Sequence, residues 1–213
     1  MLAASLAALA PLPLPGAARA DDAVSWATAQ AIELTRQGRE HAGRGDGDTA
    51  ARRYLDAIRF DPTYGAAYLD LGALQEAAGD PREAEKTYAT GLDHVTSFAE
   101  GHRARARLRL RQRRVPEAVA DLEAAATLAP TDLATLRELG AAYVIAGALP
   151  AALAAMRRAV AIAEASGEAQ IAGEARVSAR ALSLLLGAVD PVAAGSVGRG
   201  PVRSALAAAA RRR

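Results

Sequence analysis

The chain has 213 residues, of which half are apolar and only 4% aromatic, and it contains no cysteine. The lack of cysteine excludes disulfides, thiol catalysis and thiolate metal sites. A formal net charge of +2 is too small to diagnose a nucleic-acid-binding protein. Alanine dominates the apolar residues, and because alanine has the highest helix propensity, this composition predicts packed helices.

Residues 1–20 have the pattern of a signal peptide. An apolar stretch is followed by three prolines and then by Ala18-Arg19-Ala20, whose small residues fit cleavage after Ala20. The prolines make the segment a poor membrane anchor, and no other stretch is apolar and long enough to span a membrane. We therefore expect a periplasmic or secreted protein. The alternative is an uncleaved tail on a cytoplasmic protein.

From residue 31 onward the sequence repeats at an interval of about 34 residues. Alanine recurs at one position, a large residue at a second, and glycine or alanine at a third, in the same order each time. The recurring residues are Ala50, Ala84, Ala118 and Ala152; Tyr54, Tyr88, Leu122 and Met156; and Gly38, Gly72, Ala106 and Gly140. The expected units are about 31–64, 65–98, 99–132 and 133–166.

The second unit carries the clearest motif, Tyr68-x2-Leu71-Gly72 followed by Ala84-x3-Tyr88. This pattern resembles the tetratricopeptide repeat family, whose unit is two antiparallel helices in about 34 residues. The resemblance implies an all-α fold: an α-solenoid, or right-handed superhelix, of about four helical hairpins. It also implies that the first helix of each unit lines a concave groove where peptides or partner helices bind.

Glycines mark both the middle and the end of the expected first helices. Gly72 and Gly140 fall in mid-helix, where glycine costs about 1 kcal/mol relative to alanine, so we expect another group to pass close to them. Gly45, Gly79 and Gly147 follow the helices, where a left-handed C-cap is expected.

Proline and capping signals place the other boundaries. Pro62 and Pro130 should end the second helices of two units. Ser97 with Glu100 has the spacing of a capping box at the start of the third unit.

The third unit departs from the pattern in an arginine-rich stretch, His102 to Arg114. Alternation of residues suggests a strand, but the position between helical hairpins favours a helix. Arg105 stands where the other units have Leu71 and Leu139, which face inward. It must therefore reach solvent along its aliphatic stem or pair with a carboxylate.

A candidate partner-binding groove follows from the implied concave face. Because arginine binds carboxylates with two parallel hydrogen bonds, an acidic peptide segment or a free C-terminus would fit such a surface. The alternative is a solvated arginine face that pairs internally with Glu100 or Glu138. The candidate groove residues are Arg39, Glu76, Arg103, Arg107, Arg111, Arg137 and Val144.

The C-terminal part of the chain reads as a cap and a tail. Residues 168–187 form one more helical pattern, with Ile171, Ala175, Leu182 and Leu185 on one side. Such a helix covers the last apolar face of a solenoid, so we expect a cap over 167–189. Residues 190–213 are rich in glycine, alanine and arginine and predict a flexible basic tail.

No residue pattern points to catalysis. His41, His94 and His102 occur without a metal-binding motif, so no metal site, cofactor or catalytic residue is expected. The sequence predicts a non-catalytic scaffold or adaptor of the bacterial cell envelope that binds another protein. Two alternatives stay open: binding of nucleic acid or an acidic polymer through residues 102–114, and a structural homo-oligomer.

Overall fold

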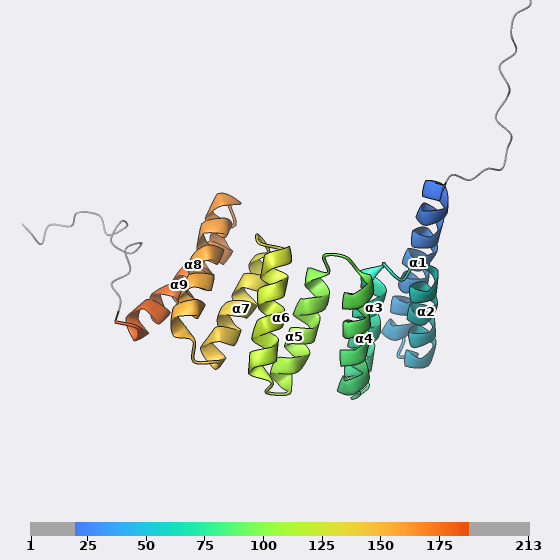
Figure 1. Ribbon diagram of the computed structural model, residues 1–213, viewed down its shortest axis with the longest axis horizontal. Helices are drawn as coiled ribbons and strands as arrows, with labels where there is room; N and C mark the ends of the chain where they lie inside the picture. Colours follow the sequence, from blue (N-terminus) through green and yellow to red (C-terminus); the bar gives the residue numbers. More distant parts are fainter. Residues whose placement is uncertain (1–19, 188–213) are drawn as a thin grey trace, which may run out of the picture.

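The computed structural model describes residues 20–187, and its side chains from residue 26. In that part of the chain there are nine helices and no strand (Figure 1). The helices are α1 (Ala20–Gly43), α2 (Gly47–Phe60), α3 (Gly65–Ala77), α4 (Pro81–His94), α5 (Ala99–Arg111), α6 (Val115–Leu128), α7 (Leu133–Ile145), α8 (Leu149–Ala165) and α9 (Ala169–Leu185). The proposed signal peptide, apart from Ala20, and the basic tail lie outside the described residues.

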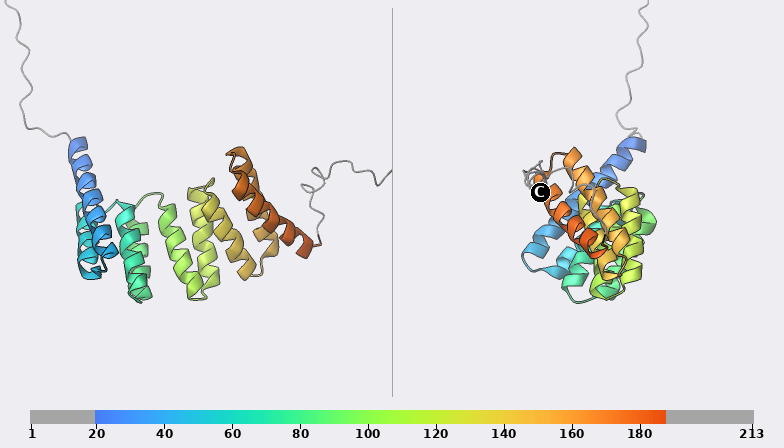
Figure 2. Two further views of the ribbon diagram at one scale, coloured as in Figure 1. Left: turned by 180° about the vertical axis from the view of Figure 1, so that it is seen from behind. Right: turned by 90° about the vertical axis from the view of Figure 1, so that its left-hand side faces the viewer.

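The helices form antiparallel pairs that stack in chain order, as Figure 2 shows from two sides. Each helix packs on the next along the chain, and the first helices of neighbouring pairs also touch, α1 with α3 and α3 with α5. The all-α solenoid of four hairpins with a further helix at its end is therefore confirmed. The arginine-rich stretch is helical and forms most of α5.

The four hairpins share one packing device, a small residue on the first helix facing a large one on the second. A Cβ placed on Gly72 would lie 2.3 Å from Cε1 of Tyr88, and one on Gly38 would lie 2.4 Å from Cε1 of Tyr54. At Gly140 the near atom is Cε of Met156, at 2.2 Å. The expected close approach is thus made by the partner helix of the same hairpin. In the third hairpin Ala106 and Leu122, both fully buried, hold these two positions.

Left-handed residues end the first helix of each hairpin. Gly45, Gly79 and Gly147 have φ angles of 81°, 83° and 75°, which confirms the predicted C-caps. The third hairpin has Arg113 at this position, with a φ of 62°. The repeat therefore imposes a backbone conformation that costs little for glycine and more for arginine.

The joint between the second and third hairpins is built around Phe98, which is 5% exposed. Its ring fits against three glycines, since a Cβ on Gly65, Gly91 or Gly101 would lie 2.2–3.0 Å from Phe98 atoms. Phe98 is also the N-cap residue of α5. The predicted capping box is wrong, because Ser97 takes a left-handed φ of 58° and leads the chain into this turn.

The final helix departs from the expected cap in one respect. Ala175 and Leu182 of α9 are buried as expected, and Ile171 is half-buried. Leu185 was expected on the same side, but it is the last residue of α9 and is 73% exposed. The cap therefore leaves apolar surface of its own uncovered.

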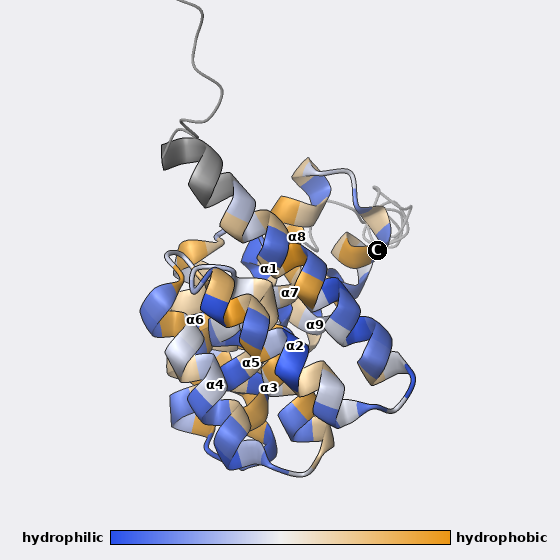
Figure 3. Cartoon of the chain, turned by 90° about the vertical axis from the view of Figure 1, so that its right-hand side faces the viewer, coloured by the Kyte–Doolittle hydropathy of each residue, from blue (hydrophilic) through white to orange (hydrophobic). Residues whose placement is uncertain are grey.

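Most helices have a polar and an apolar side, and Figure 3 shows the two kinds of residue alternating around them. Within residues 20–187, none of the helices combines the length and apolarity required of a membrane span.

Candidate functional site

A hollow of about 650 Å³ lies on the first-helix side of the solenoid, between α3 and α5. One wall is the face of α3 that carries Leu69, Ala73 and Ala77 at intervals of four residues. The opposite wall comes from α5, and the ring of Tyr88 on α4 lies below. Small side chains on α3 leave room for the backbone of a bound segment.

The structure brings four of the seven predicted groove residues to this hollow: Glu76, Arg103, Arg107 and Arg111. Glu76 comes from α3. The three arginines share one face of α5 because they are four residues apart. Arg107 and Arg111 are about half exposed, whereas Arg103 is 21% exposed.

Each of these arginines already has a carboxylate partner on a neighbouring helix. Nη1 of Arg103 lies 2.5 Å from Oδ2 of Asp132, the N-cap of α7. Nε of Arg107 donates to Oε2 of Glu138 on α7 at 3.0 Å, and Arg111 pairs with Glu76. These ion pairs join consecutive hairpins across the concave face.

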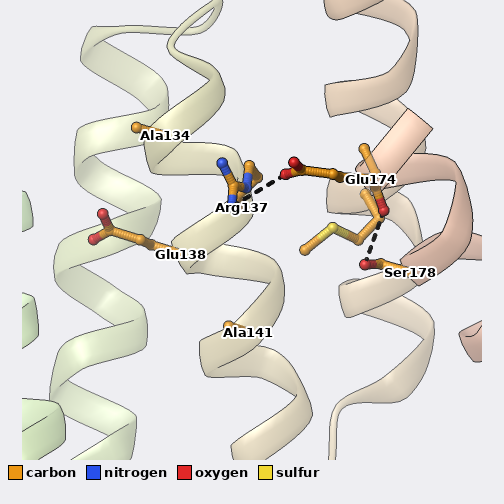
Figure 4. Close-up of a pocket in the computed structure, with 8 residues that line it drawn as sticks. Ala134, Arg137, Glu138, Ala141, Glu174 and Ser178 are labelled. Carbon is orange, nitrogen blue, oxygen red and sulfur yellow. Dashed lines mark hydrogen bonds and ion pairs between the residues drawn. The ribbon is translucent and has the colours of Figure 1, made fainter. Parts of the chain in front are cut away.

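The remaining predicted residues lie elsewhere along the same face. Arg39 on α1 donates from Nε to Oδ2 of Asp70 on α3 at 2.6 Å. Arg137 on α7 lines a second hollow of about 510 Å³ between α7 and α9, where Glu174 Oε2 lies 3.7 Å away (Figure 4). Val144 is 45% exposed near the end of α7 and lines neither hollow.

The concave face is therefore not a bare basic surface. Its five arginines lie among six carboxylates, and Glu100 is the one carboxylate of this set for which the described residues provide no ion-pair or hydrogen-bond partner. The carboxylates are Asp70, Glu76, Glu100, Asp132, Glu138 and Glu174. Pairing with Glu138 was anticipated from sequence, and pairing with Glu100 is not found.

The other arginines of α5 point into the third hairpin, where they meet Asp121 on α6. The Asp121 side chain is only 4% exposed. Arg105 donates to both of its oxygens, at 3.0 and 2.7 Å, and Nη1 of Arg109 donates to Oδ2 at 2.8 Å. Nδ1 of His102 lies 3.1 Å from Oδ1. The expectation that Arg105 finds a carboxylate is confirmed.

The pKa of Asp121 reflects two opposing influences. Burial raises it, while hydrogen bonds from Arg105 and His102 lower it, and the net result is a pKa below the usual value. Asp121 is therefore ionised at neutral pH, as a carboxylate that shares two guanidinium groups should be.

A second carboxylate extends this cluster to the preceding hairpin. Glu85 on α4 accepts from Nε of Arg109 at 3.0 Å and from Nη1 of Arg114 at 2.6 Å. Hydrogen bonding from Arg114 is the main reason why the pKa of Glu85 is lowered. The arginine-rich stretch therefore has two sides. Arg103, Arg107 and Arg111 face the hollow, whereas Arg109 and Arg114 connect the third hairpin to the second.

Sequence reasoning missed Asp121 and Glu85 as partners. The repeat could have pointed to Asp121, because an arginine that faces inward at position 105 requires an acidic residue on the helix that packs against it. The described residues contain no group of three or more His, Asp or Glu side chains that could hold a metal ion.

Comparison with known proteins identifies the repeat in one part of the chain. Residues 41–108, which run from the end of α1 into α5, match the model of the tetratricopeptide repeat. This part of the chain belongs to the tetratricopeptide repeat family. No curated protein has a significant sequence match to it.

Several solved structures have the same fold as the described part of the chain. MamA from Desulfovibrio magneticus RS-1 is 18% identical, covers 72% of this chain and 95% of its own, and has a TM-score of 0.52. PilF from Pseudomonas aeruginosa is 16% identical and has a TM-score of 0.55, and the match covers 73% of this chain and 77% of PilF. YrrB, described as having an unusual peptide-binding site, is 17% identical, with 78% and 93% covered and a TM-score of 0.50. At these identities the likeness concerns the fold alone.

Proposed function

We propose that this protein is a non-catalytic interaction scaffold that holds a segment of a partner protein across its concave face. The hollow between α3 and α5 carries this proposal, because it is open, lined by small side chains on α3 and edged by half-exposed arginines. The peptide-binding site named for YrrB supports the same use of the fold.

The chemistry of the hollow favours a partner segment with acidic groups. The arginine side chains of two ion pairs are accessible: Arg107 and Arg111 are 50% and 58% exposed, whereas their partners Glu138 and Glu76 are 24% and 18% exposed. A carboxylate of the partner can therefore reach both guanidinium groups from the open side and share them with Glu138 and Glu76. Arg103 is less suited to this role, because it is largely covered and holds the N-cap of α7.

The internal ion pairs argue against nucleic acid as the ligand. Every arginine between residues 103 and 114, apart from Arg113, has a carboxylate partner in the described structure. The phosphate backbone of nucleic acid binds through several accessible positive charges at once. Arg103, Arg105 and Arg109 are each at most 21% exposed, so this stretch offers few such charges.

We further propose that the protein acts in the cell envelope after removal of residues 1–20. The apolar run and the Ala18-Arg19-Ala20 sequence support this proposal. Fractionation followed by N-terminal sequencing should find a periplasmic or secreted chain that begins at Asp21. Recovery of an uncleaved chain from the cytoplasm would refute it.

The groove proposal is tested by affinity capture from the source organism with mass spectrometry. The variant Arg107→Glu with Arg111→Glu should lose the partners that the unaltered chain recovers, while its helical circular dichroism is retained. The control is Arg52→Glu with Arg59→Glu, a matched double charge reversal on the exposed side of α2, which should recover the same partners. Equal recovery by the groove variant would refute the proposal.

A further inference from the structure

The outer side of α9 carries an apolar stripe that no described residue covers. Val177 and Leu184 are both 72% exposed, and Ala181, which lies between them on the same side of the helix, is exposed as well. Leu185 extends the stripe at the end of the helix. Because the buried residues of α9 lie on the opposite side, this stripe has no role in packing against α8.

Gly173 lies on the same side of α9, and no described residue packs closely enough against it to require a glycine. A Cβ on Gly173 would meet nothing within 4 Å, whereas the mid-helix glycines Gly38, Gly72 and Gly140 are all held against a large side chain. Gly173 lies four residues before Val177 and so belongs to the stripe. A helix with small residues at such positions permits close approach of another helix.

The end of α9 has the same backbone conformation as the turns between the helices. Gly187 has a left-handed φ of 65°, and its N–H donates to the carbonyl of Leu184. The glycines at 45, 79, 147 and 167 have the same conformation, and each is followed within a few residues by a helix that packs antiparallel to the one before it. The same turn therefore stands at the start of residues 188–213, which lie outside the described part of the chain.

The sequence beyond Gly187 contains a segment that matches the stripe. In residues 201–213, Val202, Ala205, Leu206 and Ala209 have the spacing of one helical face, and Pro201 suits a first helical position. The intervening residues 188–200 are long enough to reverse the chain.

Charge complementarity agrees with an antiparallel arrangement. Two antiparallel helices have the same rise, about 1.5 Å per residue. If Pro201 lies beside Leu184, residue 211 therefore lies beside residue 174. The three arginines at 211–213 are then near Glu168 at the start of α9 and near Glu174, both of which are exposed, although Oε2 of Glu174 also lies 3.7 Å from Arg137. Arg–carboxylate pairs at that end would fix the direction of the segment.

We propose that residues 201–213 form a helix that packs antiparallel on the outer stripe of α9 and completes a fifth hairpin. The proposal revises the expectation of a flexible tail, since that expectation rested on the low apolar bulk of the segment alone. Small residues bury little area, but they let two helices approach closely. The occupant of the stripe is the chain's own C-terminal segment, independently of any partner in the concave groove.

Amide hydrogen exchange on the full chain tests this packing. The amides of residues 202–210 should exchange at least ten-fold more slowly than unstructured peptide. The variant Val177→Asp with Leu184→Asp should lose that protection, and Ile145→Asp, at an apolar residue of α7 that is 63% exposed, should retain it. Exchange at the unstructured rate in the unaltered chain, or protection that survives in the α9 variant, would overturn the proposal.

The absence of cysteine allows the direction and the partner of the segment to be tested with paired spin labels. With Gln170→Cys as the common site, a label at Ala210→Cys should lie about 10 Å closer than one at Arg203→Cys, given the helical rise. Light scattering of the unlabelled chain should give the monomer mass. The reverse order of distances, or a doubled mass with the segment exchanged between two copies, would overturn packing within one chain.

Discussion

The contact between Gly72 and Tyr88 offers a quantitative test of how each hairpin is packed. Alanine at position 72 would place its Cβ 2.3 Å from Cε1 and 2.6 Å from Cζ of Tyr88. An ordinary contact needs more than 3.4 Å, so the ring must move by about 1 Å. The ring is 2% exposed and its hydroxyl donates to Oε1 of Glu76 at 2.7 Å, so little free space is available for this shift.

These distances set the size of the expected effect. Overpacking of a core costs about 1–3 kcal/mol, and the upper end applies because the Tyr88 ring is rigid and hydrogen-bonded. Replacing a helical glycine by alanine returns about 1 kcal/mol. We therefore expect Gly72→Ala to lower the free energy of unfolding by about 2 kcal/mol, measured by urea denaturation followed by circular dichroism.

Two comparison variants make the test specific. At Gly140→Ala the one atom that is too close is Cε of Met156, the end of a flexible side chain, so this variant should change the free energy of unfolding by less than about 1 kcal/mol. Gly72→Ala combined with Tyr88→Leu recreates the Ala106–Leu122 pair of the third hairpin. The loss in free energy of unfolding of the double variant should be about 1–2 kcal/mol smaller than the sum of the losses of the two single variants. Additive effects, or a Gly72→Ala chain as stable as the unaltered one, would refute the packing argument.

Three further predictions concern charge and backbone conformation. Asp121→Asn should cost about 3 kcal/mol in the same denaturation assay, because it leaves the largely covered guanidinium group of Arg105 without an opposite charge, whereas Arg109 keeps its ion pair with Glu85. Acid should destabilise the protein: the pKa values of Asp121 and Glu85 are lowered in the folded state, so their contribution is present above the ordinary values of 3.8 and 4.5 and is lost as pH falls through the lowered ones. The midpoint temperature of thermal unfolding should fall as the pH is lowered below these values. A midpoint that does not change with pH would contradict the role given to the ion pairs of Asp121 and Glu85. Arg113→Gly should raise stability by about 1 kcal/mol, since glycine adopts the left-handed conformation without the side-chain penalty, and a loss of stability would show that the Arg113 side chain contributes more than its backbone costs.

The sequence alone determined the repeat, because its signals are local or periodic. A hairpin needs a small residue opposite a large one and a left-handed residue at its turn, and these requirements recur at a constant interval, at Gly72 with Tyr88 and at Gly79 for example. The helix boundaries followed from the same signals to within a few residues. The capping box at Ser97 failed because the Phe98 ring, which packs against glycines of three helices, including the distant Gly65, occupies that turn.

Only the tertiary structure decided which partners the arginines have. The repeat register separated Arg103, on the groove side, from the inward Arg105, but it did not show that the first pairs with Asp132 at the start of α7 and the second with Asp121 inside the hairpin. Which carboxylate lies within hydrogen-bond distance of a guanidinium depends on how neighbouring hairpins are rotated, and the spacing of residues in one helix carries no information on that rotation. The same reason applies to α9, whose exposed stripe became visible only once its buried side was known.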